Sequence, residues 1–218
     1  MSRTAPIRAV VFDLDGTLLD SLPLVLQAIA HAIEPFGPVP PPTEIFARLG
    51  GPPERFLPAL VGGGRNVPAA LARMTAYHDT HQQLIRPFEG VVAALDRLRA
   101  RNVALAIWTG RDRASGESLL RDHGLHDRFA TVVYGDDLPS HKPDPLGLRE
   151  ILARLGVAAS ETVFVGDADV DVLGGAACGV DTLLIRHARR VDEQLRAKAW
   201  RTVDSPREAC ELVLRALD

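Results

Sequence analysis

Two pairs of carboxylates stand where apolar runs of the chain end. Asp13 and Asp15 follow one run, and Asp167 and Asp171 follow another. Carboxylates brought together from two strand ends are hard oxygen ligands suited to Mg²⁺. A carboxylate is also a competent nucleophile towards phosphorus, with which it forms an aspartyl phosphate. These residues predict phosphoryl transfer in which Asp13 is the nucleophile and Asp13 and Asp167 are Mg²⁺ ligands.

Three further side chains suit the same chemistry. Asp15 could protonate the leaving oxygen and then take a proton from water. The hydroxyl of Thr109 and the ammonium of Lys142 could hold the transferring oxygens and offset the charge of the carboxylates. Of the 25 basic residues, only Lys142 and Lys198 are lysines. The chain therefore offers few candidates for a role that requires a lysine.

Each of these signals also has a structural interpretation. Asp15 followed by Gly16 is a common turn, and a lysine such as Lys142 usually lies on the surface. Asp169 or Asp171 could cap the helix that follows, and for Asp169 the cap is the favoured interpretation. The acidic run around Asp169 resembles the start of a calcium loop, but Val172 stands where that loop requires glycine. The order of these residues along the chain, at the ends of successive strands, favours the catalytic interpretation over the structural one.

The elements that would position these groups alternate between strands and helices. Short apolar runs predict buried strands at 8–12, 103–108, 131–134, 162–165 and 182–185. Intervening patterns predict helices at 91–101, 113–123, 145–155, 170–178 and 206–217. The alternation predicts an α/β fold, a Rossmann-like, doubly wound parallel sheet with helices on both faces. Such sheets bind ligands beyond the carboxyl ends of their strands, where the carboxylates, Thr109 and Lys142 are expected.

Residues 20–86 interrupt this alternation. They contain no pattern of a buried strand, and proline and glycine separate helix-like stretches around 21–35, 43–49, 53–60 and 67–84. We interpret 20–86 as an inserted helical domain, and 1–19 with 87–218 as the catalytic α/β core.

Composition narrows the classes of function. The chain has 218 residues, of which 46% are hydrophobic and 24% charged, as is typical of soluble globular proteins. A net charge of -3 and scattered basic residues argue against nucleic-acid binding. The two cysteines lie far apart and suit a reducing compartment, and no apolar run approaches a signal peptide or a membrane span. We expect a cytoplasmic protein that binds neither nucleic acid nor membranes.

The segment Val11–Ser21 resembles the first motif of the haloacid dehalogenase superfamily. Thr109 is similar to the second motif of that family, Lys142 to the third, and Gly166–Asp167 with Asp171 to the fourth. The motifs occur in the family's order, and the resemblance spans the whole chain. The helical insertion is similar to the mobile cap that this family carries after its first motif.

The resemblance implies roles in catalysis and phosphate binding. Asp13 would be the nucleophile and Asp15 the general acid and base. The transferred phosphate would be held by Thr109, Gly110 and Lys142.

The resemblance also implies a magnesium site. Mg²⁺ would be bound by Asp13, Asp167 and the backbone carbonyl of Asp15. Asp171 would help to anchor the metal site, in some relatives only through water. Arg111 stands where relatives vary, and no role is assigned to it.

Asp15 separates the branches of the family. Dehalogenases resemble this protein but have no acid at the position of Asp15, because displacing halide needs no leaving-group proton. Phosphonate-cleaving relatives need a lysine in the cap, and residues 20–86 contain none. The nearest pattern is that of phosphoglycolate-phosphatase-like hydrolases, which implies a Mg²⁺-dependent phosphatase acting on a small phosphorylated metabolite. The alternatives are a phosphosugar mutase with the same Asp13 and Asp15, and a non-catalytic metal- or phosphate-binding protein that has kept the fold.

The position of the insertion suggests how a substrate would be selected. The insertion leaves the core directly after the nucleophile strand and returns near Pro87. We expect it to close over the site, to exclude bulk water and to admit only small phosphate esters. Arg48 and Arg55 flank a turn at residues 50–53, but both are more simply explained as surface arginines. A monomer and a homodimer are both compatible with the sequence.

Overall fold

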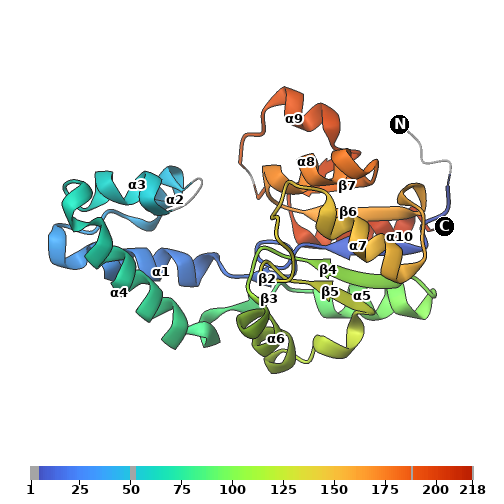
Figure 1. Cartoon of the computed structure of the whole chain (residues 1–218), viewed down its shortest axis with the longest axis horizontal. Coiled ribbons are helices and arrows are strands. Elements are labelled where there is room, and N and C mark those ends of the chain that lie inside the picture. The colour runs from blue at the N-terminus through green and yellow to red at the C-terminus, as the bar shows by residue number, and fades with distance from the viewer. Residues whose placement is uncertain (1–4, 50–52, 188, 218) are drawn as a thin grey trace. The chain divides into compact units, whose positions relative to one another are not determined.

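The first strand, β1 (Ala9–Phe12), is buried along its whole length and lies inside a six-stranded sheet. Its sequence, Ala-Val-Val-Phe, suits a strand that is covered on both faces. The computed structural model describes residues 5–49, 53–187 and 189–217. The strand order is β5-β4-β1-β6-β7-β8, and each paired neighbour is parallel (Figure 1). The other strands of this sheet are β4 (Ala104–Trp108), β5 (Thr131–Val133), β6 (Thr162–Gly166), β7 (Asp181–Ile185) and β8 (Arg201–Val203).

The direction of strand addition reverses at β1. The chain places β4 and β5 on one side of β1, then returns to add β6, β7 and β8 on the other side. Phe12 of β1 is in register with Ile107 of β4 and Val165 of β6. The three central strands therefore end at nearly the same height. Residues that follow these strands meet at one edge of the sheet, the position where ligands bind in such folds.

Helices cover both faces of the sheet. On one face α5 packs against α10, and on the other α7 packs against α8, as right-handed crossovers on either side of β1 require. The doubly wound α/β fold predicted from the sequence is confirmed. The helices of this part of the chain are α5 (Val91–Ala100), α6 (Arg113–Asp122), α7 (Leu146–Leu155), α8 (Asp169–Cys178), α9 (Glu193–Lys198) and α10 (Pro206–Arg215).

In the six-stranded sheet and the α-helices that accompany it, α9 and β8 were not predicted. The sequence of β8 is Arg-Thr-Val, and none of its three residues is fully buried. A short strand at the edge of a sheet lacks the apolar run that marks a central strand.

Chain contacts divide the protein into two units, Met1–Asp20 with Pro87–Asp218, and Ser21–Arg86. We call the first unit the core and the second the insertion. A two-stranded sheet of β2 (Leu19–Asp20) and β3 (Arg86–Pro87) forms where the chain passes from one unit to the other. Across the described part of the chain, no helix is both long enough and apolar enough to cross a membrane.

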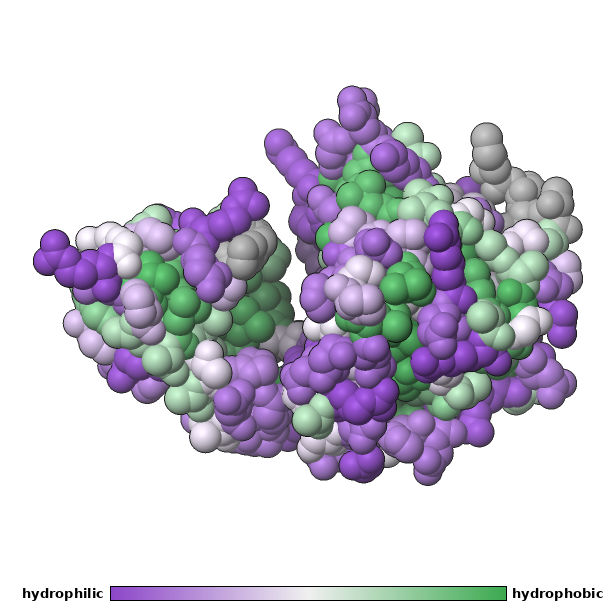
Figure 2. Space-filling view, in the orientation of Figure 1, coloured by the Kyte–Doolittle hydropathy of each residue, from purple (hydrophilic) through white to green (hydrophobic). Residues whose placement is uncertain are grey.

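The insertion is helical and has its own apolar core. Helices α1 and α4 pack along each other, and buried side chains such as Ile29, Ile45 and Leu57 lie between the helices. On the visible face of the insertion, green apolar residues lie among purple hydrophilic ones (Figure 2). Its helices are α1 (Leu22–Ile33), α2 (Pro42–Arg48), α3 (Pro53–Leu60) and α4 (Val67–Thr80).

The structure places the two arginines that flank the expected turn of the insertion on helices, Arg48 on α2 and Arg55 on α3. Arg48 ends α2 and forms an ion pair of 2.6 Å with Glu44, one helical turn earlier. Arg55 lies on α3 and is exposed. Residues 50–52 of the turn lie outside the described residues.

Candidate active site

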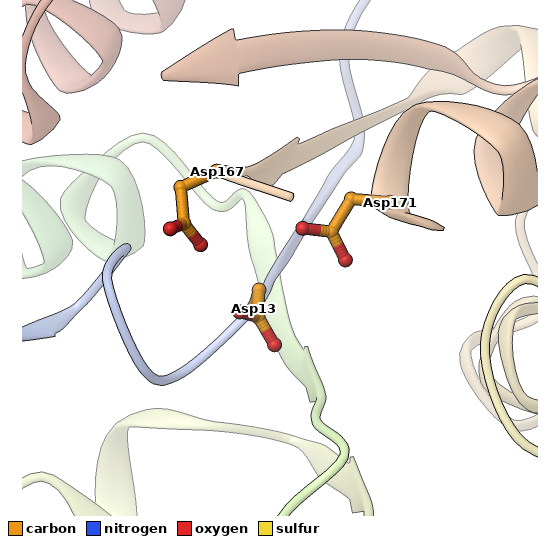
Figure 3. A group of neighbouring side chains, drawn as sticks. All are labelled: Asp13, Asp167 and Asp171. Atoms are coloured by element: carbon orange, nitrogen blue, oxygen red, sulfur yellow. The ribbon is translucent and has the colours of Figure 1, made fainter. Parts of the chain in front are cut away.

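Three buried or half-buried carboxylates meet at the carboxyl edge of the sheet. Asp13 follows β1, Asp167 follows β6, and Asp171 lies in the first turn of α8. One carboxylate oxygen of each lies within 4.8 Å of the others. Figure 3 shows the carboxylates of Asp167 and Asp171 turned towards a common space beside Asp13. The structure thus brings together the two acidic clusters of the sequence.

Lys142 joins two of these carboxylates. Its Nζ donates hydrogen bonds of 2.7 Å to Oδ1 of Asp13 and 2.7 Å to Oδ1 of Asp171. The lysine side chain is only 7% exposed, and its ammonium lies 5.1 Å from the ring centre of Trp108 and 5.2 Å from that of Phe164. The surface position that is usual for lysine does not apply here, because the ammonium is held inside the edge of the sheet.

Burial and repulsion alter the protonation of the cluster. Burial raises the pKa of Asp13 well above its usual range, although the charge of Lys142 opposes this and the other two carboxylates add to it. Burial also raises the pKa of Asp167, and the charge of Asp171 raises it further. Burial alone would lower the pKa of Lys142, but Asp13 and Asp171 outweigh this and raise it. The lysine stays charged, and it offsets only part of the negative charge around it.

The local backbone fits a site for a divalent cation. Gly16 has φ +76, and a Cβ there would lie 2.6 Å from Cγ of Asp167. A Cβ at Gly166 would lie 2.6 Å from Cβ of Asp171. Both carboxylates thus stand where only glycine leaves them room. Like charges are held together in a low-dielectric position, which is costly unless a cation joins them, and hard carboxylate oxygens suit Mg²⁺.

Of the two carboxylates that could cap α8, the structure selects Asp171 and not the favoured Asp169. The N-cap residue is Ala168, and its N–H group donates to Oδ2 of Asp171 at 2.9 Å. Asp169 is the first residue of the helix, and its carboxylate instead pairs with Arg189 at 2.8 Å. Asp171 therefore caps the helix with one oxygen and binds Lys142 with the other.

Asp15 lies beyond the end of β1 and is paired with Arg111. Nε of Arg111 donates to Oδ2 of Asp15 at 2.9 Å, and Nη2 donates to Oδ1 at 2.5 Å. The third contact of the guanidinium is from Nη1 to Oγ of Ser115, at 2.8 Å. The sequence suggested no partner for Arg111, since 96 residues separate it from Asp15.

Thr109 and Gly110 follow β4, the neighbour of β1. Thr109 is 3% exposed, and its hydroxyl oxygen accepts a hydrogen bond of 3.1 Å from the backbone N–H of Arg111. Its own backbone N–H donates to Val133 of the next strand. Thr109 is thereby fixed at the same sheet edge as Asp13, and Gly110 is the next residue along the chain.

Two residues after β7 also contact the site and were missed in the sequence. A ring nitrogen of His187 lies 2.6 Å from the carbonyl oxygen of Gly16, and the ring stacks on Phe88 at 5.5 Å. Nη2 of Arg189 donates to the backbone oxygen of Asp167 at 2.8 Å. Nothing in the local sequence marks these contacts, because they depend on how β7 aligns beside β6.

Comparison with known proteins gives a consistent result. The sequence profile of the haloacid dehalogenase-like hydrolases matches residues 10–185. A pyrophosphatase (PpaX) of Halalkalibacterium halodurans is 32% identical over 203 residues, which cover 87% of this chain and 88% of that protein. Phosphoglycolate phosphatase 1 of Pseudomonas aeruginosa is 34% identical over 201 residues, covering 86% of this chain and 74% of that protein.

Solved structures share the fold. A hydrolase of the same superfamily from Geobacter sulfurreducens superposes with a TM-score of 0.76 at 25% identity, covering 97% of this chain and 99% of the other. A predicted phosphoglycolate phosphatase from Haemophilus somnus superposes with a TM-score of 0.79 at 19% identity, covering 96% of this chain and 99% of the other.

Proposed function

The chain belongs to the haloacid dehalogenase-like hydrolase family, and on this premise we propose that it is a Mg²⁺-dependent phosphatase that hydrolyses a small phosphomonoester through an aspartyl phosphate. The observation that carries the proposal is the carboxylate of Asp13, which ends the central strand beside Lys142 and two further carboxylates. The relatives named as phosphoglycolate phosphatase and pyrophosphatase support hydrolysis of a bond to phosphorus.

In the first step Asp13 attacks the phosphorus and forms an acyl phosphate, while the bond from phosphorus to the leaving oxygen breaks. Lys142 contacts Asp13 directly, so its charge lies beside the oxygens that gain negative charge. Thr109 and the N–H of Gly110 supply hydrogen bonds to the same oxygens from the end of β4. Asp15 gives its proton to the leaving oxygen.

In the second step water attacks the phosphorus of the acyl phosphate, and Asp15 takes a proton from this water. Inorganic phosphate leaves, and the carboxylate of Asp13 is restored. Asp15 acts first as acid and then as base, so one side chain serves both halves of the reaction. It lies two residues beyond the nucleophile, on a turn whose geometry depends on Gly16.

Asp13 and Asp167 would hold Mg²⁺, together with the backbone carbonyl of Asp15. Asp171 supports this site by fixing Lys142 and the start of α8. When bound, the ion neutralises charge on the phosphate oxygens and orients the phosphate. The insertion would restrict the substrate to small phosphate esters.

A panel of substrates tests the proposed function. Purified protein is assayed for release of inorganic phosphate from two- to six-carbon phosphomonoesters, including phosphoglycolate, and from pyrophosphate, with Mg²⁺ or with excess EDTA. We expect Mg²⁺-dependent release from at least one monoester. Full activity in EDTA, or interconversion of a sugar phosphate without phosphate release, would overturn the proposal; the second result would indicate a mutase.

A further inference from the structure

Arg111 is placed and paired unlike an ordinary surface arginine. Its side chain is 9% exposed, and each of its three nitrogen atoms has a hydrogen-bond acceptor. Two of these bonds form a fork onto the two oxygens of Asp15. Arginine binds carboxylates and phosphates with the same planar, two-pronged geometry. The guanidinium of Arg111 is therefore already arranged to bind an anion with two oxygens.

Arg111 lies at the same edge of the sheet as Asp13 and Thr109. Its backbone N–H donates to Oγ1 of Thr109, which fixes it two residues beyond the end of β4. Strand β4 pairs with β1, and the guanidinium of Arg111 binds the carboxylate of Asp15, two residues after Asp13. The guanidinium thus lies at the sheet edge where the substrate phosphate is expected to meet Asp13.

The hydrogen bonds from Arg111 conflict with the role expected of Asp15, that of general acid and base. A general acid must present a carboxyl oxygen to the leaving group, but both oxygens of Asp15 accept hydrogen bonds from Arg111. To turn an oxygen towards a leaving group, Asp15 has to give up the fork in which both of its oxygens face Arg111. Breaking it leaves a buried guanidinium without its anion, which is costly unless another anion replaces the carboxylate.

We propose that Arg111 binds the substrate phosphate and that Asp15 occupies this binding position until the substrate arrives. The phosphate takes over the fork of Arg111, and Asp15 is released to act as acid and base. Substrate binding and the release of the acid are then one exchange, so that Asp15 is freed only when a phosphate is present. This inference rests on the proposed function, since it assigns Arg111 and Asp15 to the same phosphate site.

Arg113 provides a matched control two residues away. It also pairs with carboxylates, Asp137 at 2.7 Å and Glu117 at 3.0 Å, but its side chain is 50% exposed. It lies in the first turn of α6 and contacts none of the site residues in the described part of the chain. Arg113→Gln removes an arginine from the same segment without touching the proposed exchange.

The test measures the affinity of the Mg²⁺-loaded, full-length protein for inorganic phosphate by titration calorimetry. Arg111→Gln should weaken phosphate binding about tenfold or more, the effect of losing a charge-assisted fork, whereas Arg113→Gln should not change it. Asp15→Asn should tighten binding, because the competing carboxylate is gone. That gain should disappear in the Asp15→Asn, Arg111→Gln double variant. Arg111→Lys, which keeps the charge and loses the fork, should fall between wild type and Arg111→Gln.

If Arg111 only positions Asp15, Arg111→Gln leaves phosphate affinity unchanged, and the effect of Asp15→Asn is the same with and without Arg111. Either result overturns the inference. Thermal melting of each variant identifies loss of folding, in which case Arg111→Lys provides the comparison. Phosphate release by the wild type is measured first, so that failure of the proposed function is recognised separately from failure of the exchange.

Discussion

At the scale of single residues, the most constrained part of the site is the hydrogen-bonded group of Asp13, Lys142 and Asp171. Lys142 is buried against two carboxylates and two aromatic rings; Asp13 follows the central strand, and Asp171 also accepts the N–H of Ala168 at the start of α8. An ammonium fits this space because it is a compact charge whose donors point in several directions. The side chain can thus offset the charge of Asp13 and hold the start of α8 at the same time.

Lys142 is predicted to be essential for rate. Lys142→Ala should lower kcat on the order of a hundredfold, because the charge that stabilises the transferring oxygens is lost. Lys142→Arg should restore little, since the compact ammonium donates to Asp13 and Asp171 from a single atom, which a planar fork does not reproduce. The other lysine provides the control, and Lys198→Ala at the end of α9 should keep wild-type kcat. Full activity of Lys142→Ala would remove this residue from the mechanism.

Asp15 is predicted to matter most for poor leaving groups. Asp15→Asn should reduce kcat/KM for alkyl phosphates at least about tenfold more than for aryl phosphates, because only a poor leaving group needs the proton. Steady-state kinetics over a series of esters with different leaving-group pKa values measures the difference. Equal losses on both classes would show that Asp15 is not the acid.

At the scale of elements, the turn between β1 and β2 determines whether Asp167 can approach Asp13. Gly16 has φ +76, and its α-carbon faces the carboxylate of Asp167 with no room for a side chain. Gly124 after α6 has a similar φ of +63, but a Cβ there would have nothing within 4 Å. A comparison of substitutions at the two glycines therefore separates the effect of backbone strain from the effect of displacing the carboxylate of Asp167.

Replacing these glycines should give different results. Gly124→Ala should lower the free energy of unfolding by about 1–2 kcal/mol and leave kcat/KM unchanged. Gly16→Ala carries the same strain and also pushes Asp167 aside, so it should lower kcat/KM and raise the Mg²⁺ concentration needed for half-maximal activity. Denaturant unfolding and Mg²⁺ titration of activity measure both effects. If the two variants have the same Mg²⁺ dependence, Gly16 does not hold Asp167 in position.

The central elements were predictable because their signals are local. Buried parallel strands such as β1 and β6 are continuous apolar runs, and the strand ends place Asp13 and Asp167 at one edge. The edge strand β8 lacks such a run. Asp169 and Asp171 were both candidates for the cap of α8, and the buried position beside Lys142 selects Asp171, although Asp169 was favoured.

Long-range pairing explains what the sequence could not predict in the site. Arg111 meets Asp15 across 96 positions, and His187 meets Gly16 across 171 positions. Such contacts depend on strand order and on the conformation of loops between elements, neither of which leaves a periodic pattern. The residue types at strand ends therefore predicted which carboxylates meet, while the ion pair between Arg111 and Asp15 needed the structure.

At the scale of the whole molecule, the chain consists of a core that contains the candidate site and an insertion with an apolar core of its own. Chain connectivity places the start of the insertion eight residues after Asp13, since the insertion begins at Ser21. We infer that the core supplies the chemistry and the insertion the selection of substrates.

Replacing residues 22–84 with a short Gly/Ser linker tests this division. The wild type should have a much higher kcat/KM for a small phosphate ester than for a phosphopeptide, and this preference should shrink in the shortened protein because bulk is no longer excluded. Circular dichroism and melting establish that the shortened core still folds. A ratio that does not change in a folded core would mean that the insertion does not select the substrate.

The central claim is that Asp13 becomes covalently phosphorylated. The direct measurement is a rapid acid quench of Asp15→Asn with an aryl phosphate labelled at phosphorus, followed by peptide mapping. Asp15→Asn is used because the aryl group leaves without a proton donor, while loss of the base slows hydrolysis of the acyl phosphate. We predict acid-stable, hydroxylamine-sensitive label on the peptide that contains Asp13, and none in the Asp13→Asn variant. Label on another residue, or wild-type turnover by a folded Asp13→Asn protein, would contradict this account.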